Sequence, residues 1–416
     1  MNSGVSEICR RNVCRLVSLT AVAAILAAFF AIAFGPGPAA AASLEVQDLR
    51  IGIRGNATRF VIDLNAKIEP RIFGLPDPFR IVIDMPEVVF ALPPDRLGAR
   101  GGLVERLRYG LFRPGTSRFV LDLTHSAKVS QTFMLKPDGA KPWRLVIDLT
   151  PTDRAGFVSA MQPTPRIKAQ KAPDPPLRTA PVQRAFPVVV LDAGHGGVDP
   201  GAIGLSGSYE KDIVLAFAKE IKRQLEAGGR VKVVLTRERD LFLPLRERVQ
   251  TARHADADLF LSLHVNSHKS RSIRGFSAYT LSEKASDAEA DALAAKENKA
   301  DVIGGLNLGT YSDDVQNILI DFAQAKTNEL SVRFARDILV KEVSRSVRLV
   351  TRPWRSAGFA VLKAPDVASV LVELGYVTNR KEERLLRDAK YRRNLSAAIT
   401  RAVVQYLETN QSAAVR

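Results

Sequence analysis

The sequence predicts two folded regions in series: an all-β sandwich, then an α/β domain whose mostly parallel sheet has helices on both faces. Three observations carry this prediction. A hexapeptide with alternating apolar residues recurs four times before residue 150, a proline-rich stretch follows it, and from residue 188 continuous apolar strands alternate with amphipathic helices. The length of 416 residues is sufficient for two or three domains.

The chain is strongly basic, because 60 Lys and Arg residues stand against 44 Asp and Glu residues, a formal net charge of +16. Such a charge favours anionic partners. The composition, 46% hydrophobic and 25% charged, is that of a globular protein and argues against a disordered or fibrous chain. Both cysteines, Cys9 and Cys14, lie near the N-terminus, which excludes a disulfide scaffold or a cysteine-ligated zinc site elsewhere.

Residues 1–42 are predicted to be a signal peptide. Basic residues that include the pair Arg10-Arg11 precede an uncharged apolar run, and Ala40–Ala42 offers small residues for cleavage. The alternative is a permanent membrane anchor, because the run is close to the shortest possible span. The arginine pair is typical of twin-arginine export, but the residues after it fit poorly, so Sec export stays open. We expect a periplasmic protein that meets the membrane only during export and binds no nucleic acid.

Residues 43–150 are predicted to form the sandwich. In each hexapeptide, apolar residues alternate with Arg, Val and Asp, as in a strand with one buried face. Turn-forming residues separate the copies, and the copies come as two pairs along the chain, which predicts two similar sheets around a Phe/Ile/Leu core. No catalytic cluster occurs here, so we expect a binding role, with a spacer as the alternative. The copies are at residues 59–64, 80–85, 118–123 and 144–149.

Residues 151–187 contain eight prolines and few apolar residues, which predicts a semi-extended linker. The α/β domain is expected over residues 188–410. Helices are predicted at residues 210–226, around 245–252 and 315–345, and at 380–387 and 392–408. Strands are predicted at residues 188–192, 231–236, 258–264, 275–281, 359–363 and 368–374.

Four side chains of the α/β domain are expected to converge on one site. His195 follows the first strand in a glycine-rich turn, and Glu210 begins the first helix. His264 and Glu373 lie near the ends of two later strands, and ligands of open α/β sheets bind beyond the carboxyl ends of the strands. Two imidazoles and a carboxylate form a donor set of catalytic zinc sites, and a further carboxylate can take a proton from water. Each residue by itself also fits a structural role.

Three further residues are candidates to support this site. Asp192 and Asn266 are placed to orient the ligands or the substrate. Arg237 follows a strand and is a candidate for a substrate carboxylate, although a surface ion pair fits it equally well. His254 and His268 are weaker ligand candidates, because they lie on a polar helix end and in a loop.

Motifs in three runs, at residues 191–215, 259–267 and 360–379, resemble the zinc-dependent N-acetylmuramoyl-L-alanine amidases of bacterial cell division. Residues 44–150 resemble the AMIN domain that this family carries before a proline-rich linker. The resemblance implies hydrolysis of the amide between the lactyl group of N-acetylmuramic acid and L-alanine of the peptidoglycan stem peptide. It also implies a wall-targeting role for the sandwich and work at the division septum.

The resemblance implies a role for each of the four converging residues. His195, Glu210 and His264 would bind one Zn²⁺ per catalytic domain, and Glu373 would be the catalytic glutamate. Two other functions remain open at this point. One is a non-catalytic peptidoglycan-binding septal protein, and the other is a zinc peptidase on cell-wall peptides.

An insertion is expected at about residues 282–312. Residues 287–299 are good helix formers with few large apolar side chains, which predicts a loosely packed helix. In the enzymes that the chain resembles, a regulatory helix here places a glutamate on the zinc until a septal LytM-type activator binds. Glu297 is the first candidate for this glutamate and Glu289 the second, and a solvated acidic face is the alternative. The partner surface is expected on the helix with Val315, Ile318, Leu319 and Phe322.

Overall fold

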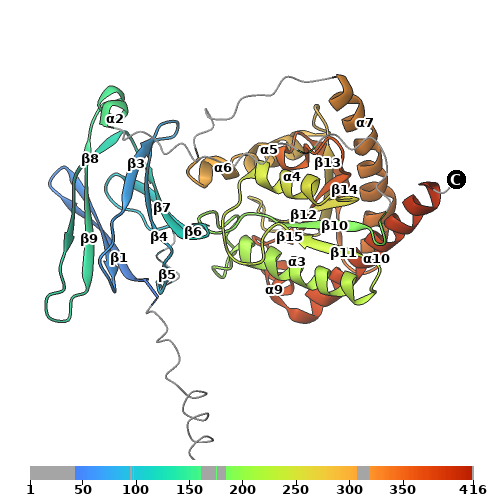
Figure 1. The fold of residues 1–416 in the computed structure, drawn as a ribbon, viewed down its shortest axis with the longest axis horizontal. Helices are drawn as coiled ribbons and strands as arrows, with labels where there is room; N and C mark the ends of the chain where they lie inside the picture. The colour runs from blue at the N-terminus through green and yellow to red at the C-terminus, as the bar shows by residue number, and fades with distance from the viewer. Residues whose placement is uncertain are drawn as a thin grey trace, which may run out of the picture. The chain divides into compact units, whose positions relative to one another are not determined.

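The chain contains a β-rich region followed by an α/β region with a mostly parallel sheet, as the sequence predicted (Figure 1). The predicted signal peptide, most of the predicted linker and the side chains of the expected partner surface lie outside the described residues. No helix among the described residues has the length and apolar character that a bilayer crossing requires. The computed structural model describes residues 43–93, 96, 98–160, 175, 184–306 and 318–414, without the side chains of 318–323 and 411–414.

The β-rich region consists of two sheets whose strands are almost all antiparallel. One sheet has the order β5-β1-β2-β9-β8 and the other the order β3-β4-β7-β6. The four hexapeptides form β2, β4, β7 and β9, and each sheet takes one copy from each sequence pair. The strands are β1 (Glu45–Arg54), β2 (Ala57–Leu64), β3 (Arg71–Leu75), β4 (Arg80–Pro86), β5 (Val89–Phe90), β6 (Val104–Arg113), β7 (Thr116–Leu123), β8 (Ala127–Leu135) and β9 (Trp143–Pro151).

The alternation within each hexapeptide sorts its side chains as expected. The apolar positions, such as Phe60 on β2 and Phe119 on β7, are fully buried and contact each other edge-to-face with ring centroids 5.9 Å apart. The Arg and Asp positions pair across neighbouring strands. Nε of Arg59 donates to Asp148 over 2.7 Å, so opposite charges lie in register on the side of the sheet away from the core.

The folded part of the β-rich region extends beyond the predicted linker boundary. The helix α2 (Arg154–Ala160) follows β9 directly. Its Phe157 is 2% exposed and packs against Phe79, with ring centroids 4.9 Å apart. One aromatic side chain thus holds a short helix on the sandwich, although the composition around it is that of a linker.

The α/β region has a six-stranded sheet in the order β11-β10-β12-β15-β13-β14. The first four of these strands are parallel, whereas β13 runs antiparallel to β15 and parallel to β14. The carboxyl ends of β10, β12 and β15 therefore meet at one edge. The strands are β10 (Val188–Ala193), β11 (Lys232–Leu235), β12 (Leu259–Asn266), β13 (Phe276–Leu281), β14 (Leu349–Ala357) and β15 (Ser369–Tyr376).

Helices cover both faces of this sheet (Figure 1). On one face, α3, α10 and a π-helical segment at Arg333–Leu339 share one buried apolar cluster with the strands. On the other face, α4 and α5 pack with Tyr279 and Phe359. The helices are α3 (Glu210–Ala227), α4 (Leu245–His254), α5 (Ala288–Glu297), α6 (Ala300–Ile303), α7 (Ile318–Val332), α8 (Val340–Ser344), α9 (Arg380–Arg387) and α10 (Ala389–Ala414).

Two secondary-structure predictions for this region were wrong. Residues 359–363 are not a strand but contain a 3₁₀ turn at Ala360–Leu362, since a short apolar run does not distinguish a strand from another buried segment. The strand β14 was missed, because Pro353 and several charged residues interrupt its apolar pattern. Its place at the edge of the sheet explains why a proline is tolerated there.

The helix α5 is packed more firmly than expected. Ala290, Leu293 and Ala294 are buried on the face of the sheet that also carries Tyr279. The side chain of Asp287 accepts a hydrogen bond from the backbone of Ala290 over 2.9 Å and caps the helix. Small residues lie close to the sheet here, so a low content of large apolar residues did not mean weak packing.

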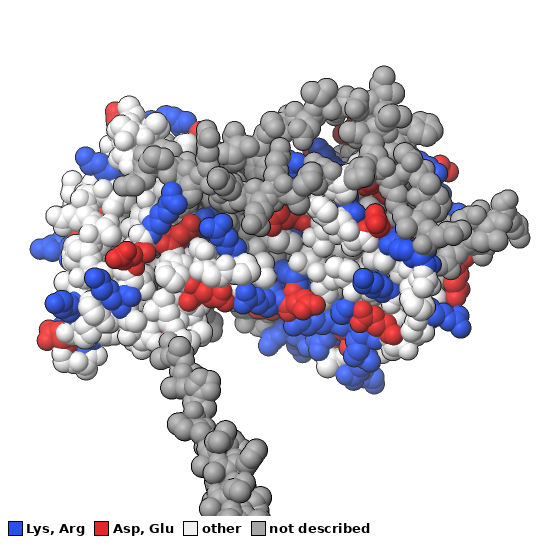
Figure 2. Space-filling model, viewed as in Figure 1, with Lys and Arg blue, Asp and Glu red and all other residues white. Residues whose placement is uncertain are grey.

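Charge is distributed over the surface in both signs. On the face drawn in Figure 2, Lys and Arg side chains lie beside Asp and Glu side chains over the described residues. The net charge of +16 belongs to the chain as a whole and favours anionic polymers in general, and salt weakens such an attraction.

Candidate active site

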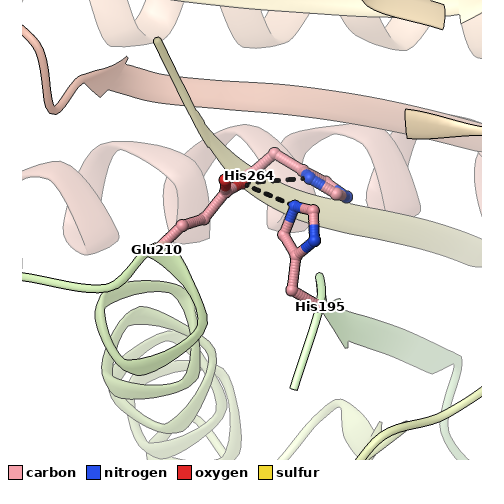
Figure 3. Close-up of side chains that lie close together, drawn as sticks. All are labelled: His195, Glu210 and His264. Atoms are coloured by element: carbon pink, nitrogen blue, oxygen red, sulfur yellow. Dashed lines mark hydrogen bonds and ion pairs between the residues drawn. The ribbon is translucent and has the colours of Figure 1, made fainter. Parts of the chain in front are cut away.

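Three buried side chains form a cluster at the carboxyl edge of the α/β sheet. One ligating atom from each of His195, Glu210 and His264 lies within 4.8 Å of the other two. Figure 3 shows them converging from three elements: the loop after β10, the first residue of α3 and the end of β12. The structure thus brings together the three residues that the sequence singled out as ligands.

The loop after β10 positions His195 through an unusual backbone. His195 has a φ of +57°, in the left-handed region that residues other than glycine uncommonly adopt. Gly194 lies against the ring of His264, and a Cβ atom at this glycine would be 2.5 Å from Cε1 of that ring. The glycine therefore lets the two imidazoles approach, with ring centroids 4.9 Å apart in an edge-to-face arrangement.

Backbone amides hold the carboxylate of Glu210 on both sides. Its Oε2 accepts a hydrogen bond from the backbone of Ala202, and its Oε1 accepts one from the backbone of Val265, both over 2.8 Å. Its Oε1 also lies 3.1 Å from Nε2 of His195 and 3.2 Å from Nδ1 of His264. Two backbone amides therefore hold the carboxylate between the two rings.

The donor set fits a metal ion. Nδ1 of His195 donates to Asp199 over 2.8 Å, which leaves Nε2 facing the cluster, where that nitrogen makes no hydrogen bond among the described residues. A carboxylate behind a ligating histidine is typical of metal sites. Burial alone would lower the pKa of His195, but Asp199 and Glu210 outweigh it and raise this pKa well above its ordinary value. The site thus attracts positive charge, as a site for a cation must.

Asp192 supports the loop that carries His195. This fully buried carboxylate accepts hydrogen bonds from Thr236, Ser262 and Arg248 over 2.7–2.8 Å. Arg248 also donates to the backbone carbonyl of His195 over 2.7 Å. Asp192 therefore supports the backbone of His195 through Arg248. Arg248 lies on α4, and the sequence analysis did not identify it.

Arg237 had two predicted roles, and its contacts favour support of the same loop. The residue is 2% exposed, and its guanidinium donates to the backbone carbonyls of Ala193 and Gly194 over 2.8 and 2.9 Å. Asn266 is buried at the end of β12, and its Oδ1 accepts a hydrogen bond from the backbone of Ser267. Arg237 also donates to the backbone carbonyl of Lys211, so backbone carbonyls engage its guanidinium in a buried place. Neither a substrate contact nor a surface ion pair has support in these surroundings.

Glu373 lies beside the cluster on β15. It is paired in register with His264 on β12 and is fully buried. Neither of its carboxylate oxygens has a hydrogen-bond partner among the described residues. Burial raises the pKa of Glu373 well above its ordinary value, and the nearby carboxylate of Glu210 raises it further. A carboxyl group in such a setting is suited to exchange a proton.

Glu297, the last residue of α5, reaches the cluster. Its Oε2 lies 3.2 Å from Nε2 of His195 and 3.3 Å from Nδ1 of His264. Its Oε1 accepts a hydrogen bond from Lys296 over 2.9 Å. Burial alone would raise the pKa of Glu297, but Lys296 and the two imidazoles lower it well below its ordinary value. Glu289, the second candidate, instead contacts Arg355, so of the two glutamates only Glu297 is at the cluster.

His254 and His268 lie apart from the cluster. Nδ1 of His254 donates to the carbonyl of Gln250 at the end of α4, and Nδ1 of His268 accepts from the backbone of Ser270 in a loop. Asp199 was missed by the sequence analysis. A signal was available, because a ligating histidine usually has a carboxylate partner and Asp199 is the nearest acid after His195.

The fold and the buried cluster define an α/β protein with two imidazoles and a carboxylate that could hold a metal ion. The family model described as N-acetylmuramoyl-L-alanine amidase matches residues 189–405, and the AMIN domain model matches residues 48–149. The chain belongs to the N-acetylmuramoyl-L-alanine amidases. It is an enzyme that hydrolyses an amide of peptidoglycan, as the resemblance implied.

Relatives with the same activity in their names match most of the chain. The N-acetylmuramoyl-L-alanine amidase AmiC of Escherichia coli O6:H1 is 33% identical and covers 90% of this chain and 93% of its own. AmiC of Neisseria meningitidis serogroup B is 34% identical over 85% of this chain and 88% of its own. Among solved structures, the catalytic domain of CwlV from Paenibacillus polymyxa is 27% identical and covers 54% of this chain and 99% of its own, with a TM-score of 0.38.

Proposed function

We propose that this amidase is a zinc enzyme that cleaves the bond between the lactyl group of N-acetylmuramic acid and L-alanine during daughter-cell separation. The observation that carries the proposal is the buried cluster of His195, Glu210 and His264, with Glu373 next to His264 in register. Two imidazoles and one carboxylate are a donor set of catalytic zinc sites. Residues 1–42 would direct export to the periplasm, and residues 43–150 would bind the wall.

Each residue has a separate task in this reaction. When bound, a zinc ion would polarise the scissile carbonyl and lower the pKa of its water. Asp199 holds the ring of His195 in the orientation that leaves Nε2 free. Glu373 accepts a proton from the attacking water and delivers it to the amine of L-alanine as this amine leaves. The high pKa of the buried carboxyl suits the second half of this transfer, because the group must also be a proton donor.

The same proposal includes self-inhibition. The carboxylate of Glu297 lies within 3.3 Å of a nitrogen of each imidazole, where the open coordination position and the scissile carbonyl would have to be. Substrate and Glu297 therefore compete for one place. A septal activator of the LytM type would relieve the competition by drawing α5 away from the sheet. We assign this role to Glu297 alone, since the carboxylate of Glu289 is engaged elsewhere.

Metal analysis and product analysis together test the proposed reaction. The purified protein should contain about one zinc ion per chain, and muropeptides incubated with it should gain a free L-alanine amine. The variant Glu373→Gln should keep the zinc and lose the hydrolysis, because only the proton carrier is removed. A wall-binding protein without activity would show binding and no product even as the Glu297→Gln variant, whereas a peptidase would release amines at bonds within the peptide. Either result would contradict the proposal.

A further inference from the structure

The helix α5 brings two carboxylates to the face of the sheet, and only one of them is at the metal-ligand cluster. Glu297 lies at the cluster, and Oε2 of Glu289 lies 2.7 Å from Nη1 of Arg355 on β14. The two glutamates are eight residues apart on one helix, which corresponds to about 12 Å along its axis. The helix therefore covers a strip of the sheet from the cluster to β14.

Arg355 is a buried cation with two carboxylates near its Nη1, Glu289 at 2.7 Å and Asp287 at 3.7 Å. Its side chain is 6% exposed, and its Nε has no hydrogen-bond partner among the described residues. The guanidinium lies beside the ring of Tyr279, 5.3 Å from the centroid. Glu289 approaches Nη1 while half of its own side chain is exposed. A buried guanidinium is stabilised best by a carboxylate that accepts two parallel hydrogen bonds, so this site has capacity for a better partner than Glu289.

The strand register brings Arg355 to the same face as the proposed proton carrier. Ser277 on β13 pairs with Glu373 on β15, and Tyr279, two residues further along β13, pairs with Arg355 on β14. Paired residues, and residues two apart on a strand, point to one face of a sheet. Two strand spacings and a two-residue offset place the Cα atoms of Glu373 and Arg355 about 12 Å apart.

This separation suits a peptide substrate. An extended chain spans about 3.5 Å per residue, so a carboxylate on the second residue of the stem peptide lies about 7 Å beyond the scissile amide. The reach of an arginine side chain closes the remaining distance. We propose that Arg355 binds a carboxylate of the stem peptide. While α5 covers the sheet, the carboxylate of Glu289 occupies the position that the substrate carboxylate would take. This inference rests on the proposed function and adds a substrate-binding residue to it.

The test uses the zinc-loaded full chain and two muropeptides that differ only in the stem carboxylate, which is free in one and amidated in the other. For the unaltered protein, amidation should raise KM about 10- to 100-fold, the effect of losing hydrogen bonds to a charged group. Arg355→Gln should raise KM for the free carboxylate to the same extent and abolish the difference between the two substrates. Arg355→Lys keeps the charge without the planar fork and should show an intermediate preference.

Arg352 provides the matched control, because it lies on the same strand and its side chain is 77% exposed. Arg352→Gln should keep the difference in KM between the free and the amidated muropeptide that the unaltered protein shows. Equal KM values for the two substrates with the unaltered protein would overturn the inference, whether or not Arg355→Gln folds. A preference that persists in Arg355→Gln would overturn it as well. Hydrolysis of both substrates with equal KM would leave the proposed function intact, whereas hydrolysis of neither would contradict that function itself.

Discussion

Oδ2 of Asp199 lies 2.8 Å from Nδ1 of His195, and both side chains are buried. Burial alone would raise the pKa of Asp199, but the contact with His195 lowers it. The carboxylate of Asp199 therefore remains charged. Asp199→Asn should weaken zinc binding about 10- to 100-fold, because the ring loses the partner that fixes its orientation and its basicity. Competition with a chelator measures this affinity. Asp337→Asn, at an acid of the surface, is the control, and an unchanged affinity for Asp199→Asn would contradict the role given to Asp199.

Removal of the charge at Glu297 should activate the enzyme in the absence of a partner. Glu297→Gln should raise the basal rate of hydrolysis about 10- to 100-fold, since a charged contact with two imidazoles no longer competes with the substrate. Dye release from labelled cell walls measures the rate. Glu283→Gln changes an exposed acid of the same insertion and should leave the rate unchanged. Self-inhibition by Glu297 would be wrong if both variants had the basal rate of the unaltered protein with equal zinc content.

The buried pair of Asp192 and Arg248 should be important for stability. Asp192→Ala leaves the guanidinium of Arg248 without its carboxylate in a fully buried place, which costs about 3–5 kcal/mol in comparable pairs. Thermal unfolding should therefore occur at a clearly lower temperature. An unfolding temperature equal to that of the unaltered protein would show that water or another group replaces the carboxylate.

Activity should fall on the acid side because Glu373 must be ionised to accept a proton. Burial and the Glu210 carboxylate raise the pKa of Glu373 well above the ordinary glutamate value of about 4.3. The ionised form is present above this pKa and is lost as the pH falls through it, so the acid limb of kcat/KM should lie above pH 4.3, the ordinary value. A pH profile of kcat/KM measures the limb. A limb at the ordinary value, or the same limb in Glu373→Gln, would contradict the assignment.

The continuous apolar strands and the residues at their ends could be predicted from the sequence. His195, His264 and Glu373 follow or end such strands, and the carboxyl ends of parallel strands meet at one edge. The edge strand β14, which carries Arg355, could not be predicted in this way, because charged residues and a proline interrupt its apolar pattern. That β14 lies next to β13 is known only from the strand order of the sheet.

The partners of the charged residues depended on three-dimensional contacts. Arg237 follows a strand, as a substrate-binding arginine would, but its guanidinium donates to carbonyls of the loop after β10. Arg248 is one of several charged residues on an amphipathic helix, and only the fold shows that it reaches Asp192. The packing of α5 was also underestimated, because alanines bury little area each but let a helix lie close to a sheet.

An anomalous difference map at the zinc absorption edge, from crystals of the zinc-loaded protein, tests the central claim most directly. We predict one strong peak, with Nε2 of His195, a carboxylate oxygen of Glu210 and Nδ1 of His264 at about 2.0–2.2 Å, the usual zinc–ligand distances. A map without a peak at these side chains, or with its main peak at other residues, would contradict the account of this site as the centre of the amidase.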